Sequence, residues 1–253
     1  MHYTDLIFDL YGTLVDIHTE ENDHVWEKTA LYLGYYGASF TGASLKAAFS
    51  AEMQRREAQA GQSYEMFPDI PFDSVIAGLL RSQDITERAD ELALNAAQVF
   101  RVTSTEYIRL YDGVLEALAT LRQHGYRLWL LSNAQRAFTA YELRYLGLTD
   151  QFDGIYLSSD YQCRKPDGRF FRALLEEQHL DPQTCLMIGN DRETDIAGAQ
   201  AAGLSTLYMH TNLTPADQKE ADSALYPCSK QTDRRYLEFE GANWNALVGF
   251  FMH

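Results

Sequence analysis

The stretch that decides the fold is LIFDLYGTLVD, which occupies residues 6–16. Three apolar residues lead to Asp9, and the Gly12–Thr13 turn follows after two more residues. This pattern is typical of a short buried strand that ends at the acid. The carboxylate of Asp9 would stand in solvent with backbone N–H groups around it, where it can attack phosphorus or carbon and form a covalent intermediate. The stretch therefore predicts a nucleophilic aspartate at the end of the first strand.

Short apolar runs alternate with helical patterns along the rest of the chain. Runs at residues 127–131, 185–188 and 205–209, with a weaker one at 154–157, are typical of buried parallel strands. Helical patterns at 113–124, 135–146, 168–179 and 194–202 lie between them. This alternation predicts an α/β fold, a Rossmann-like parallel sheet core with helices on both faces. In such sheets ligands bind beyond the carboxyl ends of the strands.

Residues 17–111 break the alternation and contain no convincing strand. They show amphipathic helical patterns at 21–36, 42–60, 71–82 and 87–109, with a loop at 67–71. We therefore expect an all-helical cap domain at 17–111, inserted after the first strand of a core made of residues 1–16 and 112–253. The tail after residue 214 is less regular and ends in a helix-like segment near 244–251. Aromatic residues that could line a pocket in the cap, although their spacing is more typical of packing, are Trp26, Tyr32, Tyr35, Tyr36, Tyr64 and Phe67.

The composition limits the partners. The 253 residues carry a formal net charge of −15, which argues against nucleic acid and anionic membranes as main partners. The chain shows no basic segment followed by an apolar one at its start, and no apolar run long enough to span a bilayer. We expect a cytoplasmic monomer or homodimer that binds a small anionic substrate. Because the chain as a whole is acidic and would repel an anion, cations and N–H groups at the site itself must supply the positive charge that binds this substrate.

Three further segments place polar residues after predicted strands. Ser132 and Asn133 follow the strand at 127–131 and precede a helix, where a hydroxyl and free N–H groups suit an anion. Lys165, in a turn that Pro166 fixes, can neutralise charge on a nucleophile and a substrate. In the segment GNDRETD, residues 189–195, two acids lie four positions apart and can face one place across a helical turn. Hard oxygen donors near Asp9 would suit Mg²⁺.

With these four segments in this order, each at the end of a predicted strand, the chain resembles the haloacid dehalogenase superfamily of hydrolases over nearly its whole length. The resemblance implies a nucleophilic Asp9, oriented by Thr13, and hydrolysis of the aspartyl intermediate by water. It also implies an anion pocket and a Mg²⁺ site. The pocket would be formed by Gly12, Ser132, Asn133 and Lys165, and the metal would be bound by Asp9, the backbone carbonyl of Tyr11 and Asp191, with support from Asp195.

Tyr11 is where the chain departs from the family's phosphatases. Those enzymes usually carry D-x-D-G-T, and the second Asp protonates the leaving oxygen and then activates water. The family's 2-haloacid dehalogenases carry D-x-Y-G-T, as here, and their halide leaving group needs no proton. The dehalogenases, however, use no metal, whereas Asp191 beside Asp9 without a cation would be two carboxylates in like-charge repulsion. We therefore expect a Mg²⁺-dependent phosphohydrolase that acts on a small metabolite with a good leaving group.

Three alternatives remain open at this point. A metal-independent 2-haloacid dehalogenase would need a cationic cap residue for the substrate carboxylate, for which Arg55 and Arg56 are candidates. A phosphonate hydrolase would need a cap lysine that forms a Schiff base, and the insert offers Lys28 and Lys46. The third alternative is a phosphate-binding protein with weak catalysis.

Overall fold

The computed structural model describes residues 3–60, 67–219 and 236–251. Its core is a sheet of six parallel strands in the order β5-β4-β1-β6-β7-β8, which confirms the predicted α/β class. In chain order the strands are β1 (Asp5–Phe8), β4 (Arg127–Ser132), β5 (Gly154–Leu157), β6 (Cys185–Gly189), β7 (Ser205–His210) and β8 (Tyr236–Glu240).

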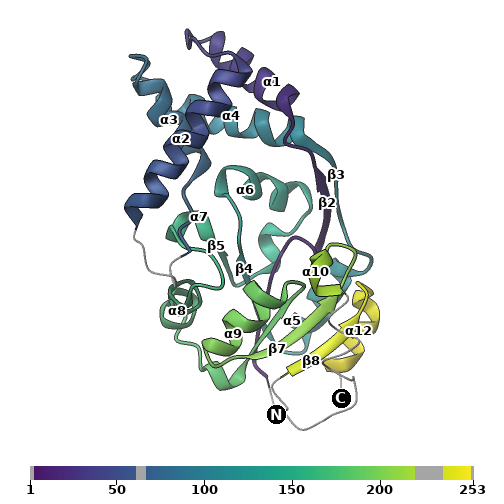
Figure 1. Ribbon diagram of the computed structural model, residues 1–253. Helices are drawn as coiled ribbons and strands as arrows, with labels where there is room; N and C mark the ends of the chain where they lie inside the picture. The colour runs from purple at the N-terminus through teal and green to yellow at the C-terminus, as the bar shows by residue number, and fades with distance from the viewer. Residues whose placement is uncertain (1–2, 61–66, 220–235, 252–253) are drawn as a thin grey trace.

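Helices cover both faces of the sheet (Figure 1). Side chains alternate along β1, so Phe8 packs on one face and Ile7 on the other, and both are fully buried. The Phe8 face is covered by α5 (Val114–Gln123), α6 (Arg136–Tyr145) and α12 (Trp244–Phe251). The Ile7 face is covered by α8 (Gly168–Glu177) and α9 (Gly198–Ala201). Shorter helical elements are η1 (Thr149–Gln151), α7 (Ser158–Tyr161), η2 (Pro182–Thr184), η3 (Arg192–Ala197) and α10 (Ala216–Lys219).

The insert forms a helical cap above the carboxyl ends of the strands (Figure 1). Its helices are α1 (Asp23–Gly34), α2 (Gly42–Ala60), α3 (Phe72–Arg81) and α4 (Ala89–Ser104). They enclose an apolar cluster of their own, in which the Trp26 ring lies 4.8 Å from the Phe100 ring. Trp26 is therefore a packing residue, whereas Tyr35 is 76% exposed. Tyr64 lies outside the described residues.

The expectation that the insert contains no strand is wrong. β2 (Val15–Thr19) and β3 (Thr105–Leu110) pair antiparallel and form a two-stranded ribbon between core and cap. The helix predicted at 87–109 ends at Ser104, and the chain continues as β3. The prediction failed for two reasons. The helical pattern of α4 continues into the residues of β3, and β2, the strand that pairs with β3, lies about ninety positions earlier in the chain. The predicted start of the cap, residue 17, lies within β2, and its predicted end, residue 111, directly follows β3.

The C-terminal part of the chain belongs to the core. The tail adds strand β8 to the sheet, where an irregular segment was expected, while the predicted helical segment is present as α12. Trp244 on α12 is fully buried, packs on Phe8, and donates a hydrogen bond from Nε1 to the Thr13 carbonyl at 3.1 Å. The tail therefore supports the loop that carries Asp9. Among the described residues no helix combines the length and the apolar character needed to cross a membrane.

Candidate active site

The predicted site residues converge because their strands are neighbours. β4, β1 and β6 lie side by side in the middle of the sheet, and the carboxyl ends of parallel strands meet at one edge. Asp9 follows β1, Ser132 ends β4, and Asp195 lies in η3 after β6. The backbone N–H of Asp9 donates to the Ile188 carbonyl at 2.9 Å, which fixes the end of β1 against β6.

Lys165 is the centre of this group. Its ammonium is 1% exposed and donates to Asp9 Oδ1 at 2.8 Å, Asp195 Oδ1 at 2.6 Å and the Leu131 carbonyl at 2.8 Å. Burial lowers the pKa of Lys165, but the charges of Asp195 and Asp9 raise it by more, so the amine stays protonated. One buried cation therefore faces two buried carboxylates.

The excess of negative charge affects the pKa of Asp195. Burial and the charge of Asp9 raise the pKa of Asp195 to about 7, against the opposing effect of Lys165. A site with an unbalanced buried carboxylate is costly unless a proton or a cation compensates it. The site therefore has capacity for one further positive charge.

The second oxygen of Asp9 is lightly held. Thr13 Oγ1 lies 3.4 Å from Asp9 Oδ2, and also 3.2 Å from Asn190 Oδ1, so its single proton serves one of them at a time. Ser132 Oγ lies 3.4 Å from Asp9 Oδ1. These long contacts leave the carboxylate available to a ligand or a substrate.

Asn133 acts on the loop of Lys165. Its Nδ2 donates to the Lys165 carbonyl at 2.9 Å, and its Oδ1 accepts from the Lys165 backbone N–H at 2.7 Å. Both ends of the amide are engaged with the main chain, so Asn133 positions Lys165.

Gly12 is needed for close packing. It adopts φ +85°, and a Cβ there would lie 2.3 Å from the side chain of Asn190. Asn190, which is 5% exposed, thus fills the space between the loop after β1 and the loop after β6. Sequence reasoning passed over Asn190, although its place directly after an apolar strand was a usable signal.

Asp191 caps the helix that follows it. Its Oδ1 accepts from the backbone N–H groups of Glu193 at 2.9 Å and Thr194 at 3.0 Å. Its own backbone N–H donates to Asp195 Oδ2 at 3.0 Å. Oδ2 of Asp191 receives no hydrogen bond from the residues that the structure describes.

The donor set fits a hard cation. Asp9 Oδ2, Asp191 Oδ2 and the Tyr11 carbonyl are oxygens on the loops after β1 and β6, and the described part of the chain places no hydrogen bond on the carbonyl. Mg²⁺ prefers such oxygens and retains several waters. Asp195 is engaged by Lys165 and can act only indirectly in this geometry. The carboxylate oxygens of Asp9, Asp191 and Asp195 do not all lie within 4.8 Å of one another; among the described residues, the one group of three His, Cys, Asp or Glu side chains that meets this distance is the exposed His18, Glu20 and Glu106 at the ribbon.

The side chain of Tyr11 contacts helices α6 and α4. Its hydroxyl donates to Glu142 and lies 2.9 Å from Thr139 Oγ1, both on α6. The Arg101 guanidinium, from cap helix α4, lies 5.5 Å from the Tyr11 ring and donates to Glu142 at 2.6 Å. Burial and the charge of Glu142 raise the pKa of Tyr11 far above its ordinary value. The phenol therefore keeps its proton and is not available as a general acid.

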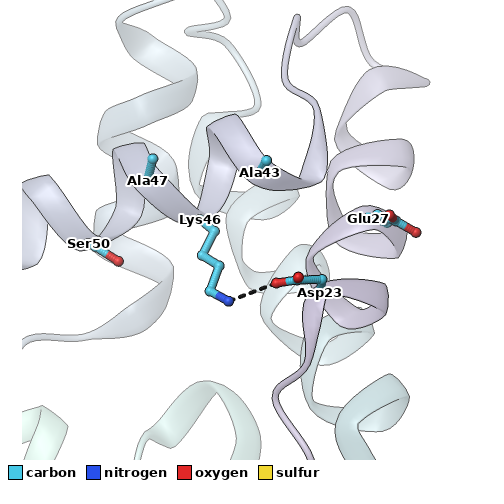
Figure 2. Close-up of a pocket in the computed structure, with 6 residues that line it drawn as sticks. All are labelled: Asp23, Glu27, Ala43, Lys46, Ala47 and Ser50. Atoms are coloured by element: carbon cyan, nitrogen blue, oxygen red, sulfur yellow. Dashed lines mark hydrogen bonds and ion pairs between the residues drawn. The ribbon is translucent and has the colours of Figure 1, made fainter.

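The cap cations proposed from the sequence lie elsewhere. Arg55 and Arg56 both pair with Glu52 on their own helix, at 2.7 Å. Lys46 pairs with Asp23 at 2.8 Å and borders an open cavity of about 360 Å³ between α1 and α2 (Figure 2). Lys28 is exposed. The cap cation that contacts the loop after β1 is Arg101, which lies against the Tyr11 ring and donates to Glu142 on α6. Because these partners are distant in the sequence, the residues around Arg101 do not predict its contact with the site.

The cap loop at 67–71 is joined to the segment that carries Lys165. The backbone N–H of Arg164 donates to the Phe67 carbonyl at 2.9 Å, and that of Asp69 donates to the Gln162 carbonyl at 3.2 Å. The Asp69 carboxylate accepts from Gln135 Nε2 at 2.7 Å and from the Ser158 hydroxyl. The cap therefore contacts the loops after β4 and β5 directly.

Asp69 gives a testable pH dependence. Burial raises its pKa above the ordinary 3.8, so the folded chain retains a proton that the unfolded chain has released. Stability from this group is complete below pH 3.8 and is lost as pH rises through the raised pKa. Asp69→Asn removes that dependence. We expect its free energy of unfolding, minus that of the wild type, to increase from pH 4 towards pH 7 in urea titrations; a flat or decreasing difference would contradict this.

Comparison with known proteins identifies the family of this chain. The family model for haloacid dehalogenase-like hydrolases matches residues 6–203. The phosphoglycolate phosphatase of Mesorhizobium japonicum is 27% identical over 215 residues, which are 85% of this chain and 86% of that protein. The glyceraldehyde 3-phosphate phosphatase of Methanothermobacter thermautotrophicus is 30% identical over 115 residues, 46% of this chain, so the match spans about half (51%) of that relative.

The fold has solved counterparts. The 2-haloacid dehalogenase of Pseudomonas syringae pv. Tomato aligns over 100% of both chains with a TM-score of 0.60 and 18% identity, a likeness of fold alone. The family model, in contrast, covers most of the sequence and includes every predicted site residue. The protein therefore belongs to the haloacid dehalogenase-like hydrolases and is an enzyme of that superfamily.

Proposed function

We propose that the protein is a Mg²⁺-dependent phosphohydrolase that works through a covalent aspartyl intermediate on Asp9. Its substrate would be a small anionic metabolite whose leaving group departs without a proton. The phosphatase names of the curated relatives support phosphoryl transfer. The observation that carries the proposal is the charge of the site. One buried cation, Lys165, faces two buried carboxylates, those of Asp9 and Asp195.

That charge balance makes a metal necessary for an anionic substrate. A phosphate group approaching Asp9 would meet net negative charge in a buried place, in a chain that is itself at −15. Asp9, Asp191 and the Tyr11 carbonyl would hold Mg²⁺. The ion would screen the nucleophile from the phosphoryl oxygens and neutralise charge in the transition state.

The chain's own residues then define the steps. A carboxylate oxygen of Asp9 attacks phosphorus, the bond to the leaving oxygen breaks, and the aspartyl phosphate forms. Lys165 and Ser132 stabilise charge on the transferring group. Since Tyr11 is engaged by Glu142 and its pKa is raised, the leaving oxygen departs as an anion. Water then hydrolyses the intermediate. Acyl and aryl phosphates fit this site better than alkyl phosphates.

A metal-independent 2-haloacid dehalogenase is the second candidate. Tyr11 favours it, because a halide needs no acid at that position. Against it, Arg55 and Arg56 are held by Glu52 and do not contact the site residues. The two remaining alternatives have less support. A Schiff base is disfavoured at Lys28, which is exposed, and at Lys46, which is engaged by Asp23 on the cap and contacts none of the site residues.

The decisive experiment compares p-nitrophenyl phosphate and 2-chloropropionate, each with Mg²⁺ and with chelator. We expect turnover of the aryl phosphate that is lost in EDTA and restored by added Mg²⁺, and no halide release in either condition. Halide release that persists in chelator would establish the dehalogenase instead. Binding of Mg²⁺ and phosphate without turnover of any substrate would indicate a binding protein.

A further inference from the structure

The segment at residues 211–218 contacts both loops of the proposed metal site. Thr211 Oγ1 donates to the Gly12 carbonyl at 2.7 Å, one residue after Tyr11. At the other end, Gln218 contacts the loop after β6. The segment follows β7 and extends into α10, which Figure 1 shows beside the end of β7, near the base of the β2–β3 ribbon. It lies beyond residues 6–203, where the family model matches.

Gln218 is oriented by its partners. It is 8% exposed. Its Oε1 accepts from the backbone N–H of Arg192 at 2.7 Å and from the Tyr208 hydroxyl at 3.3 Å. Because a backbone N–H can only donate, the carbonyl end of the amide must face Arg192. The NH₂ end then faces Asp191, and Nε2 donates to Asp191 Oδ1 at 3.3 Å.

With this contact, the two oxygens of Asp191 have different functions: Oδ1 fixes the carboxylate, and Oδ2 is available to a ligand. Oδ1 accepts three N–H groups, from Glu193, Thr194 and Gln218. Oδ2 accepts none from the described residues and remains for a ligand. A carboxylate that is fixed through one oxygen presents the other in a defined direction, as outer-shell partners of metal ligands commonly ensure.

The two ends of the segment are held at a fixed separation. Thr214 Oγ1 accepts from the Thr211 backbone N–H at 2.9 Å, and the Gln218 backbone N–H donates to the Pro215 carbonyl at 3.0 Å. Thr211 and Thr214 are both buried. A short internally bonded segment therefore joins the Gly12 carbonyl to the Asp191 carboxylate.

We propose that Gln218 is a positioning residue for Asp191, and that the segment at 211–218 sets the distance between the two loops that bind Mg²⁺. The proposal rests on the Mg²⁺ dependence proposed above. It assigns a functional role to a part of the chain outside the matched family region. Gln218 touches neither substrate nor metal and acts through Asp191.

The test is Mg²⁺ affinity in Gln218→Leu, measured by titration calorimetry on the full chain. We expect the Kd for Mg²⁺ to rise about 10- to 100-fold, while kcat at saturating Mg²⁺ returns to within about threefold of the wild type. A merely structural role would lower stability in chelator without this split between affinity and kcat. Gln178→Leu is the matched control, since Gln178 also bonds a tyrosine hydroxyl, that of Tyr156 on β5, and its loss should leave the Kd unchanged.

Thr211→Val tests the other end of the segment and serves if Gln218→Leu does not fold. It keeps the shape of the side chain, removes the hydrogen bond to Gly12, and should also weaken Mg²⁺ binding. A folded Gln218→Leu or Thr211→Val with a Kd within twofold of the wild type overturns the inference. A wild-type chain that binds no Mg²⁺ overturns the proposed function itself, so the two failures are distinguishable.

Discussion

Lys165→Met is expected to abolish turnover and to lower the free energy of unfolding by about 3–5 kcal/mol. The lysine is 1% exposed and is hydrogen-bonded to Asp9 and Asp195, both buried. Methionine fills a similar volume but leaves two uncompensated carboxylates in the core of the site. Removal of one partner from a buried ion pair costs more than the pair itself contributes. Denaturant titration and turnover of an aryl phosphate measure the two effects.

A double variant separates stability from catalysis. Lys165→Met combined with Asp195→Asn removes one of the two unpaired charges and should recover much of the lost stability. It should recover no activity, because the cation that faces Asp9 is still missing. If Lys165→Met alone kept activity within tenfold of the wild type, or lost no stability, the central place of Lys165 in the site would be refuted.

Tyr11→Asp is expected to raise turnover of an alkyl phosphate by about 10²–10⁴, the usual contribution of a general acid. An aryl phosphate, whose leaving group needs no proton, should change by less than about tenfold. The structure favours survival of the fold, because Glu142 keeps Arg101 as its partner after the phenol is removed. Steady-state kinetics with both substrates at saturating Mg²⁺ measure the difference.

Tyr11→Asn is the matched control for this gain. It has the size of aspartate and cannot supply the proton, so alkyl phosphate turnover should stay at the wild-type level. An equal gain in both variants would mean that removing the tyrosine opens the site and that no acid is involved. No gain in Tyr11→Asp would indicate that the site lacks more than the acid.

The sequence was sufficient for those features that depend on nearby residues. Asp9 directly follows the apolar strand β1 and Ser132 ends the neighbouring strand β4, and the carboxyl ends of adjacent parallel strands lie together. Lys165 comes to the same place from the segment after β5 and α7. The parallel sheet was predictable from the alternation of strand and helix patterns, and the superfamily from the resemblance carried by the four segments in their order. Asn190 was not predicted as a site residue, because its packing against Gly12 joins two loops that are far apart in the sequence.

Features that depend on distant partners could not be predicted. β3 has the β-branched and aromatic residues of a strand, but only pairing with β2, at the other end of the insert, makes it one. The hydroxyl of Tyr11 finds Glu142 at a separation of 131 residues. In the sequence Gln218 resembles any polar residue of a surface loop, and its role depends on its contacts with Arg192, Tyr208 and Asp191, which form only in the fold.

The paired strands at the base of the cap have an architectural consequence. Val15 is directly opposite Leu110, so the chain leaves the sheet and returns to it at one point. A tight turn joining the two strands would bridge the gap left by excision of the helices, without rethreading any strand of the sheet. The cap helices above Asp9 thus form an exchangeable module. Replacing them would change which molecules reach Asp9, while the order of the core strands and their loops stays the same.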